Sequence, residues 1–517
     1  MKNILLLLFV FVIAGCIDDN GNYDYKATRE LDVKGVARTN ILTQGESVTF
    51  APKAIVKYDL TETEIEGVKF EWSVDHEVVS TEKIFTYTAK ENGTHQAMLR
   101  MIDPLTEAIS CYVFKIEVQS AFIEGLLILS EENGQTQLSI IRSKLLSDPD
   151  TLIYDKEWKD IYVSANGGEQ IKGKPLSMTE HWSYDGNSSI GEITLLTKEN
   201  DKVRVQELNG ENIKRETYIE QEFVDEKVPE FFNPKKVIHT PYDSFILDES
   251  GEMYTRRSEN SGGYHTGYFS DDIKLWNGKK FSDILFTQFY KIKALLALEE
   301  NEKGEQNYVG IYSGYYNCDN NLYRLEIVGD DVLDFKDIKG DIVWDDWRNN
   351  GNWGESGMSV MTKTEEGDYI LHCFDLSEAT LTSIEVISSY KVNLTKEKGI
   401  SNLVGMCTNK LLNYTYYCDG KTIYAIDNEF NEDFYTMKTF DKEIVAIEDC
   451  SISSVYGNYP TAMAIAFEDG TIEIWEIERK NAGKFKNRIY VSKNNYGKIK
   501  NLLSKIGDGG NLFFNLN

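Results

Sequence analysis

Short runs of alternating apolar and polar residues dominate the chain from residue 30 to residue 120. The runs lie at 47–50, 68–74, 84–88, 93–101 and 108–118. A period of two sends successive side chains to opposite faces of a strand, so that one face is buried and the other is solvated. The pattern predicts an antiparallel β-sandwich over residues 30–120, with Trp72 in its core.

A second rhythm begins at Gly125. Turn triplets with strand-like runs beside them recur at 132–134, 199–201, 249–251, 319–321, 366–368, 419–421 and 469–471. Such a period, near 50 residues, is typical of a propeller, because a single hairpin unit cannot bury both of its faces until its neighbours stack against it. We therefore expect an all-β chain whose residues 121–517 form a β-propeller, with seven blades favoured and eight possible.

Two other architectures compete with the propeller. A β-helix would need a shorter period, and several sandwiches would show linkers between them, neither of which the sequence displays. The apolar run Leu502–Ile506 is consistent with a short helix near the end of the chain.

The amino terminus has the form of an export signal. A positive start, Met1–Asn3, precedes the apolar run Ile4–Ile13, which is too short for a permanent membrane span. The run ends in Ile13-Ala14-Gly15-Cys16, which resembles the bacterial lipobox. This resemblance implies a signal peptide over 1–15, a diacylglycerol on Cys16 and a lipidated tether over 16–29. A buried first helix is the alternative.

Two acidic residues, Asp18 and Asp19, follow the cysteine. They resemble the signal that sends Bacteroidetes-type lipoproteins to the outer face of the outer membrane. We therefore expect a lipid-anchored, surface-exposed protein of the outer membrane. An ordinary solvated linker is the alternative.

Charge narrows the class of partner. The chain has 55 Lys and Arg against 84 Asp and Glu, a net charge of −29. Because this surface repels phosphate backbones, we expect no nucleic-acid partner, and membrane contact only through the anchor.

The six cysteines other than Cys16 contain no CxxC pair, so we expect neither a zinc ribbon nor a redox motif. Cys407 and Cys418 have a spacing that would suit a hairpin; most of the six are expected to be small buried residues.

Motifs for chemistry are scarce. The six histidines form no HExxH motif, and the sequence has no GxSxG elbow, Walker A loop or GxGxxG turn in its usual context. We therefore predict no catalytic residues, no metal and no cofactor. Since carboxylates from different blades can still converge, an enzyme stays open as the less favoured alternative.

One aromatic stretch suggests a binding site. Trp344, Trp347 and Trp353 lie within ten residues together with Arg348, in what the repeat predicts to be a connection between blades. Exposed indoles stack on sugar rings or peptide side chains while polar neighbours hydrogen-bond the rim. The alternative is that these indoles fill grooves between blades.

Further aromatic segments are weaker candidates. Tyr315 and Tyr316 are included in the predicted ligand site, and 264–268 forms a third aromatic segment. The long connections 143–175 and 210–234 are expected to be functional or packing elaborations and not linkers, because they are rich in apolar residues.

The sandwich region resembles the PKD or Ig-like domains. The resemblance rests on Phe70-Glu71-Trp72, Tyr87 and the Asn92-Gly93 turn, although the WDFGDG signature of that family is absent. With the lipobox and the propeller-like remainder, the chain resembles the PKD-like family lipoproteins of Bacteroidetes-type bacteria.

The resemblance implies an accessory protein of a SusC/SusD-like uptake system that captures an oligosaccharide or an oligopeptide. Two rivals are a surface hydrolase or lyase with a propeller active site, and a scaffold or lid of the transporter that binds no small ligand.

Overall fold

The structure, a computed structural model, forms two compact units, Met1–Ser120 and Ala121–Asn517. It describes residues 31–58, 61–147, 150–181, 192–239, 243–257, 268–270, 279–285, 294–301, 303, 306–312, 323–329, 339–348, 356–377, 380, 382–409, 412–428, 434–451, 461–478 and 483–506.

The first unit is a β-sandwich. Its strands are β1 Asp32–Lys34, β2 Thr39–Thr43, β3 Ser47–Phe50, β4 Lys53–Tyr58, β5 Thr61–Glu64, β6 Lys69–Val74, β7 Glu77–Ser80, β8 Phe85–Thr88, β9 Gly93–Ile102 and β10 Ile109–Gln119. They form a five-stranded sheet of order β2-β10-β9-β6-β7, a three-stranded sheet β1-β4-β5 and the pair β3-β8. The predicted sandwich is confirmed.

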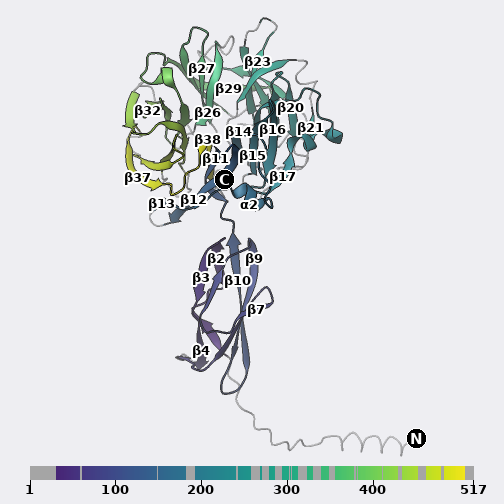
Figure 1. The fold of residues 1–517 in the computed structure, drawn as a ribbon, viewed down its shortest axis with the longest axis vertical. Helices are drawn as coiled ribbons and strands as arrows, with labels where there is room; N and C mark the ends of the chain where they lie inside the picture. The colour runs from purple at the N-terminus through teal and green to yellow at the C-terminus, as the bar shows by residue number, and fades with distance from the viewer. Residues whose placement is uncertain are drawn as a thin grey trace, which may run out of the picture. The chain divides into compact units, whose positions relative to one another are not determined.

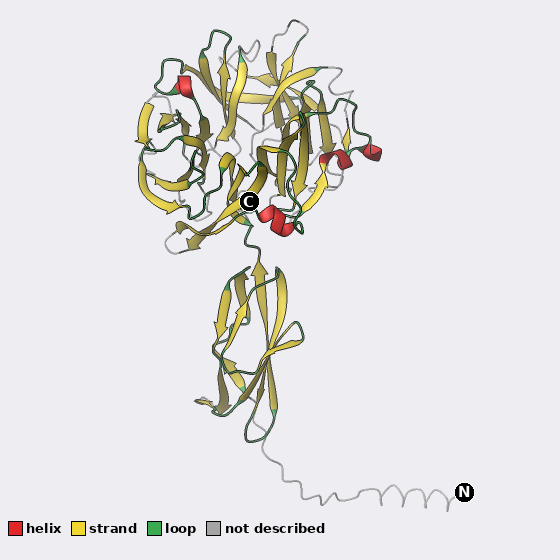
Figure 2. Ribbon diagram, in the orientation of Figure 1, coloured by secondary structure: helices red, strands yellow, loops and turns green. Residues whose placement is uncertain are grey.

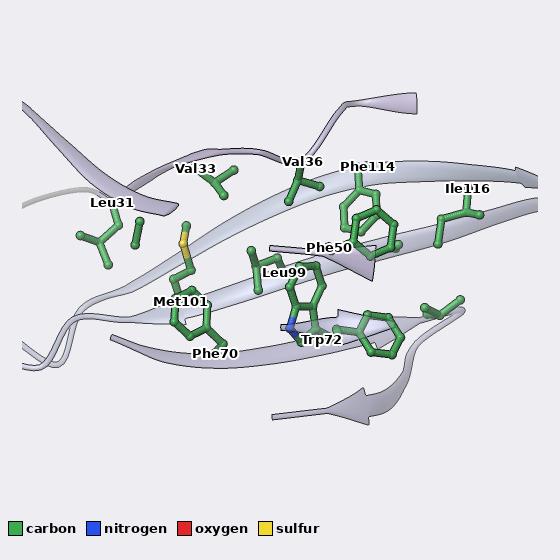
Figure 3. Packing of buried hydrophobic residues seen from close by; sticks show 14 of the residues in the cluster. Leu31, Val33, Val36, Phe50, Phe70, Trp72, Leu99, Met101, Phe114 and Ile116 are labelled. Atoms are coloured by element: carbon green, nitrogen blue, oxygen red, sulfur yellow. The ribbon is translucent and has the colours of Figure 1, made fainter. Parts of the chain in front are cut away.

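An aromatic cluster fills the sandwich core (Figure 3). The Phe50 ring lies 5.6 Å from the Trp72 ring and 5.3 Å from the Phe114 ring, measured between centroids. Trp72 is buried, and its Nε1 donates a hydrogen bond of 2.8 Å to the carbonyl oxygen of Glu82. Trp72 is therefore the core tryptophan that the strand pattern predicts.

The second unit is a propeller, and its described residues form seven four-stranded blades (Figure 1). The first blade consists of β11 Glu124–Glu132, β12 Gln135–Ser147, β13 Asp150–Trp158 and β38 Lys498–Ile506. The second has β14 Lys174–His181, β15 Glu192–Glu199, β16 Lys202–Leu208 and β17 Arg215–Tyr218, and the third has β18 Pro234–His239, β19 Asp243–Asp248, β20 Met253–Arg257 and β21 Phe269–Ser270. The fourth has β22 Lys280–Leu285, β23 Ala294–Glu300, β24 Gln306–Tyr312 and β25 Tyr323–Val328, and the fifth has β26 Asp341–Arg348, β27 Ser356–Lys363, β28 Tyr369–Leu376 and β29 Ser383–Asn393. The sixth has β30 Gly405–Thr408, β31 Tyr414–Cys418, β32 Thr422–Asp427 and β33 Phe434–Thr439, and the seventh has β34 Ile444–Asp449, β35 Ala462–Phe467, β36 Ile472–Ile477 and β37 Phe485–Val491.

The blades close into a ring. A buried apolar cluster lies at each of the seven blade interfaces, including the one between the seventh and first blades, where Ile474 and Ile128 belong to the same cluster. The last strand, β38, pairs antiparallel with β11 and completes the first blade. This pairing covers the edge of β11, which would otherwise be open to pairing with another chain.

Two details differ from the sequence prediction. Leu502–Ile506 belongs to strand β38 and not to a helix, because pairing with β11 supplies backbone partners that a short isolated helix lacks. The central hairpin turn of the fourth blade lies between β23 and β24, whereas 319–321 falls between β24 and β25, outside the described residues.

The outermost strands of the fourth and fifth blades, β25 and β29, pair in parallel, so these two blades share one eight-stranded sheet.

Short helices and cysteines add little to this framework. The helices are α2 Ile161–Ala165, η1 Ile219–Glu222, η2 Val224–Glu226 and η3 Ile400–Asn402 (Figure 2). Among the described helices, none is long and apolar enough to cross a membrane.

Of the described cysteines, Cys111 is exposed and Cys373, Cys407, Cys418 and Cys450 are buried, all with free thiols. Cys407 faces Tyr416 across its hairpin, not Cys418.

Candidate functional site

The predicted tryptophan site lies on a strand. Trp344 and Trp347 belong to β26, the innermost strand of the fifth blade, so their placement in a connection between blades is wrong. Residues three apart on a strand point to opposite faces. Accordingly, Trp344 packs against the cluster between the fifth and sixth blades, and Trp347 packs against the cluster between the fourth and fifth.

Both indoles are half-buried, as the groove-filling alternative expects. Ligand binding by them stays a prediction. Arg348 ends β26. Trp353, Tyr315, Tyr316 and Cys16 lie outside the described residues.

The innermost strands carry a repeated irregularity. These strands, β14, β18, β22, β26, β30, β34 and β38, are called the inner ring. In six of them the pairing with the next strand skips one residue near the strand start; the skipped residues are Leu176, Lys235, Ser282, Val343, Val445 and Lys500, called the bulge ring. A bulge turns its side chain out of the regular alternation, and bulges are frequent beside functional sites.

The bulge ring is largely solvent-facing. Leu176, Lys235, Val343 and Lys500 are exposed, while Ser282 and Val445 are half-buried. Lys235 Nζ donates a hydrogen bond of 2.6 Å to the carbonyl oxygen of Ser282, which joins two neighbouring bulges. The bulge ring therefore combines two lysines, three aliphatic residues and one serine.

A charged cluster, Lys236, Asp283 and Asp345, joins three blades next to these bulges. Lys236 Nζ lies 3.1 Å from Asp283 Oδ1 and 2.7 Å from Asp345 Oδ1. Burial lowers the pKa of Lys236, but the two carboxylates raise it by more, so its net shift is upward. Burial raises the pKa of Asp345, against the opposing effect of Lys236, and Asp283 adds to the rise.

Polar contacts continue around the inner ring. Thr408 donates to Asp346 Oδ2 from its backbone nitrogen at 3.0 Å and from its hydroxyl at 2.8 Å. Further links are Asn409 Nδ2 to Asp449 Oδ1, the Ser504 nitrogen to Glu448 Oε1, the Met178 nitrogen to Asn501 Oδ1, and the ion pair of Lys505 with Glu180. These links fix the blades relative to one another, and a rigid scaffold is what a binding site needs.

Sequence reasoning missed this cluster. Asp345 lies inside the tryptophan stretch, but Lys236 and Asp283 are more than 40 residues apart in the sequence and belong to no motif that would connect them. Both residues follow the bulge in their inner strands, and these bulges are visible only in the strand pairing of the structure. Within the part of the chain that the structure describes, no group of three His, Cys, Asp or Glu side chains is arranged to hold a metal ion.

A sandwich of this kind followed by a seven-bladed ring defines an all-β, propeller-bearing protein. Residues 16–175 match the model of the PKD-like family, so the amino-terminal domain is PKD-like.

Solved structures to which the chain is similar include a quinonprotein alcohol dehydrogenase-like protein from Bacteroides thetaiotaomicron, at 12% identity and a TM-score of 0.39 over 92% of this chain and 100% of that one. A second is Hsv2 of Kluyveromyces lactis, at 8% identity and a TM-score of 0.36, with 74% of this chain and 97% of that one covered. A third is AofleA from Arthrobotrys oligospora, at 8% identity and a TM-score of 0.33, with 63% of this chain and 88% of that one covered. Likeness of this size does not extend to function. The comparison with curated proteins gave no match.

Proposed function

We propose that the protein is a lipid-anchored binding protein of the outer-membrane surface, which captures an oligosaccharide or oligopeptide for a SusC/SusD-like transporter. The observation that carries the binding role is the bulge ring, because four of its six side chains are solvent-exposed on a rigid closed scaffold. The PKD-like domain and the lipobox-like Ile13–Cys16 support the cellular setting.

Anchoring makes weak binding useful. A lipid on Cys16 would hold the propeller within reach of the transporter, where tethering raises the effective ligand concentration to the millimolar range. Replacing Cys16 by Ala should move the protein from the membrane fraction to the soluble fraction. Retention of this variant in the membrane would contradict the anchor.

A binding screen tests the capture role. The soluble chain that starts after Asn22 is presented with glycan and peptide libraries, with Val343→Asp as the site variant. Val491→Asp is a matched control on outer strand β37, since Val343 and Val491 are 44% and 43% exposed. We expect saturable binding that Val343→Asp weakens at least tenfold and Val491→Asp leaves unchanged. Equal effects of the two variants would remove the bulge ring as the site.

One observation favours a hydrolase as a second candidate. Asp283 and Asp345 come from neighbouring blades and share Lys236, and the raised pKa of Asp345 suits a general acid. Product formation from a bound glycan, abolished by Asp345→Asn in a variant with an unchanged melting temperature, would establish this activity. Binding without product would leave capture alone.

A further inference from the structure

The most exposed large apolar side chains among the described propeller residues lie on two adjoining segments of its outer edge. Phe231, Tyr268 and Val224 are 82%, 60% and 52% exposed, whereas no other large hydrophobic side chain among the described propeller residues exceeds 45%. They lie on two segments, 219–233 and 268–270, which a β-bridge between Phe223 and Phe269 joins. In Figure 2 the 3-10 helices η1 and η2 of the first segment lie at the right-hand edge of the propeller, near β21 of Figure 1.

A buried aromatic base supports these side chains. Phe223 packs against Phe232, Tyr254 and Phe269 at centroid distances of 5.0, 5.6 and 5.7 Å. Each exposed residue is the immediate chain neighbour of a buried one: Phe231 precedes Phe232, Val224 follows Phe223, and Tyr268 precedes Phe269. The base fixes the backbone beneath the three exposed side chains, which form what is called the rim platform below.

Area and charge decide which partner the rim platform fits. From the usual size of such side chains, the three expose roughly 350 Å² together, less than the ~800 Å² of mixed apolar and polar surface that each partner buries in a standard protein interface. Residues 219–233 contain five acidic residues and one lysine, Lys227. This charge repels anionic polysaccharides and anionic lipid surfaces. A neutral sugar chain meets no such repulsion, and it offers an apolar ring face to the aromatics and hydroxyl donors to the carboxylates.

We propose that Phe231 and Tyr268 form a stacking platform for pyranose rings of a neutral oligosaccharide, a second glycan site apart from the bulge ring. The inference rests on the proposed capture function and specifies its ligand class. The exposed ion pair of Asp225 with Lys227, at 3.0 Å, follows Val224 on the same segment and offers a carboxylate acceptor and an ammonium donor to sugar hydroxyls.

The test uses the chain that starts after Asn22 on an array of neutral and anionic oligosaccharides, followed by calorimetry on the best neutral ligand. We expect Phe231→Ala and Tyr268→Ala each to weaken binding about fivefold to tenfold, and the double variant to weaken it at least tenfold. Phe231→Tyr keeps the aromatic ring and should therefore bind as the parent protein does. Ile387→Ala is the matched control, since Ile387 is 45% exposed on the outermost strand of the fifth blade. Unchanged melting temperatures confirm that the variants fold.

The outcomes separate this site from the capture function. Neutral-glycan binding that survives the double variant but is lost in Val343→Asp overturns the rim platform and leaves capture standing. Binding of peptides only, or of anionic glycans only, also overturns it while capture stands. Association with a purified transporter component that the double variant abolishes, without glycan binding, makes this surface a protein-docking site and overturns the glycan proposal.

Discussion

His95 of the sandwich lies between two hydrogen-bond acceptors. Its Nδ1 is 2.6 Å from Asp75 Oδ2, and its Nε2 is 2.9 Å from the carbonyl oxygen of Glu91. Only the imidazolium form can donate from both nitrogens at once. The hydrogen bond with Asp75 is the largest cause of an upward shift in the pKa of His95, and it lowers the pKa of Asp75.

The pH dependence of the sandwich follows from this pair. Because the folded pKa of His95 is raised above 6.5, its stabilising effect should be complete below about pH 6.5 and disappear as pH rises through the folded pKa. His95→Gln should cost about 1 kcal/mol at pH 6, a low value for a charge-assisted bond because Asp75 is half exposed.

An NMR titration of the His95 ring and hydrogen exchange over β9, each from pH 5 to pH 9, measure both effects. His76→Gln is the control. A His95 midpoint at or below 6.5 would contradict the prediction.

A buried charge network ties the second blade to the third. Arg256 Nη2 lies 2.8 Å from Glu207 Oε1, and both side chains are almost completely buried. Glu207→Gln should lower the free energy of unfolding by about 3–5 kcal/mol, because it leaves the guanidinium with too little compensating charge. The exposed pair of Arg204 with Glu199 is the control, where Glu199→Gln should cost less than about 1 kcal/mol. Urea unfolding of the two variants measures the difference. Similar losses of unfolding free energy in Glu207→Gln and Glu199→Gln would contradict the role of burial.

At the scale of elements, one carboxylate holds the segment between β37 and β38 against the first blade. Glu157 on β13 accepts hydrogen bonds from the hydroxyls of Tyr490 and Tyr496, from the backbone nitrogens of Lys493 and Asn494, and from Asn494 Nδ2, at 2.6 to 2.9 Å. Burial raises the pKa of Glu157, but these donors outweigh burial and lower it overall. These hydrogen bonds fix the segment that connects β37 to β38, and so position β38 beside β11.

Removing this carboxylate should weaken ring closure. Glu157→Gln places an amide where every partner is a donor, so we expect a loss of about 2–4 kcal/mol and faster hydrogen exchange in β38. In the parent protein this contribution should be present above pH 4.5 and decline as pH falls through the lower folded pKa. Hydrogen exchange of β38 peptides, with Glu132→Gln as control, measures it. Unchanged exchange in Glu157→Gln would contradict the role.

The whole propeller depends on pairing between the two ends of its sequence. Truncation before Lys498 removes β38 and exposes the edge of β11 and one side of two interblade clusters. We expect loss of the cooperative melting transition and aggregation, since an open edge invites pairing between molecules. Truncation after Ile506 is the control and should melt like the parent protein. A cooperative transition at the parental temperature without β38 would show that closure is dispensable.

Much of the fold could be predicted because its information is local. Alternation of apolar residues marks most strands of the sandwich, and turns such as Asp419-Gly420 and Asp469-Gly470 mark the central hairpins of the blades. The fourth blade is the exception, because the turn triplet at 319–321 does not mark its central hairpin. The central turn of this blade lies between β23 and β24.

A local pattern of residues is enough to predict the all-β class, the core role of Trp72 and the repeat of blades, because each depends on neighbours within a few residues along the chain. Three features emerge only in the folded chain: β38 completes the first blade, Trp344 and Trp347 pack between blades, and Lys236 meets Asp283 and Asp345. The physical reason is that ring closure and contacts between blades join residues tens to hundreds of positions apart, for which a single sequence carries no periodic signal.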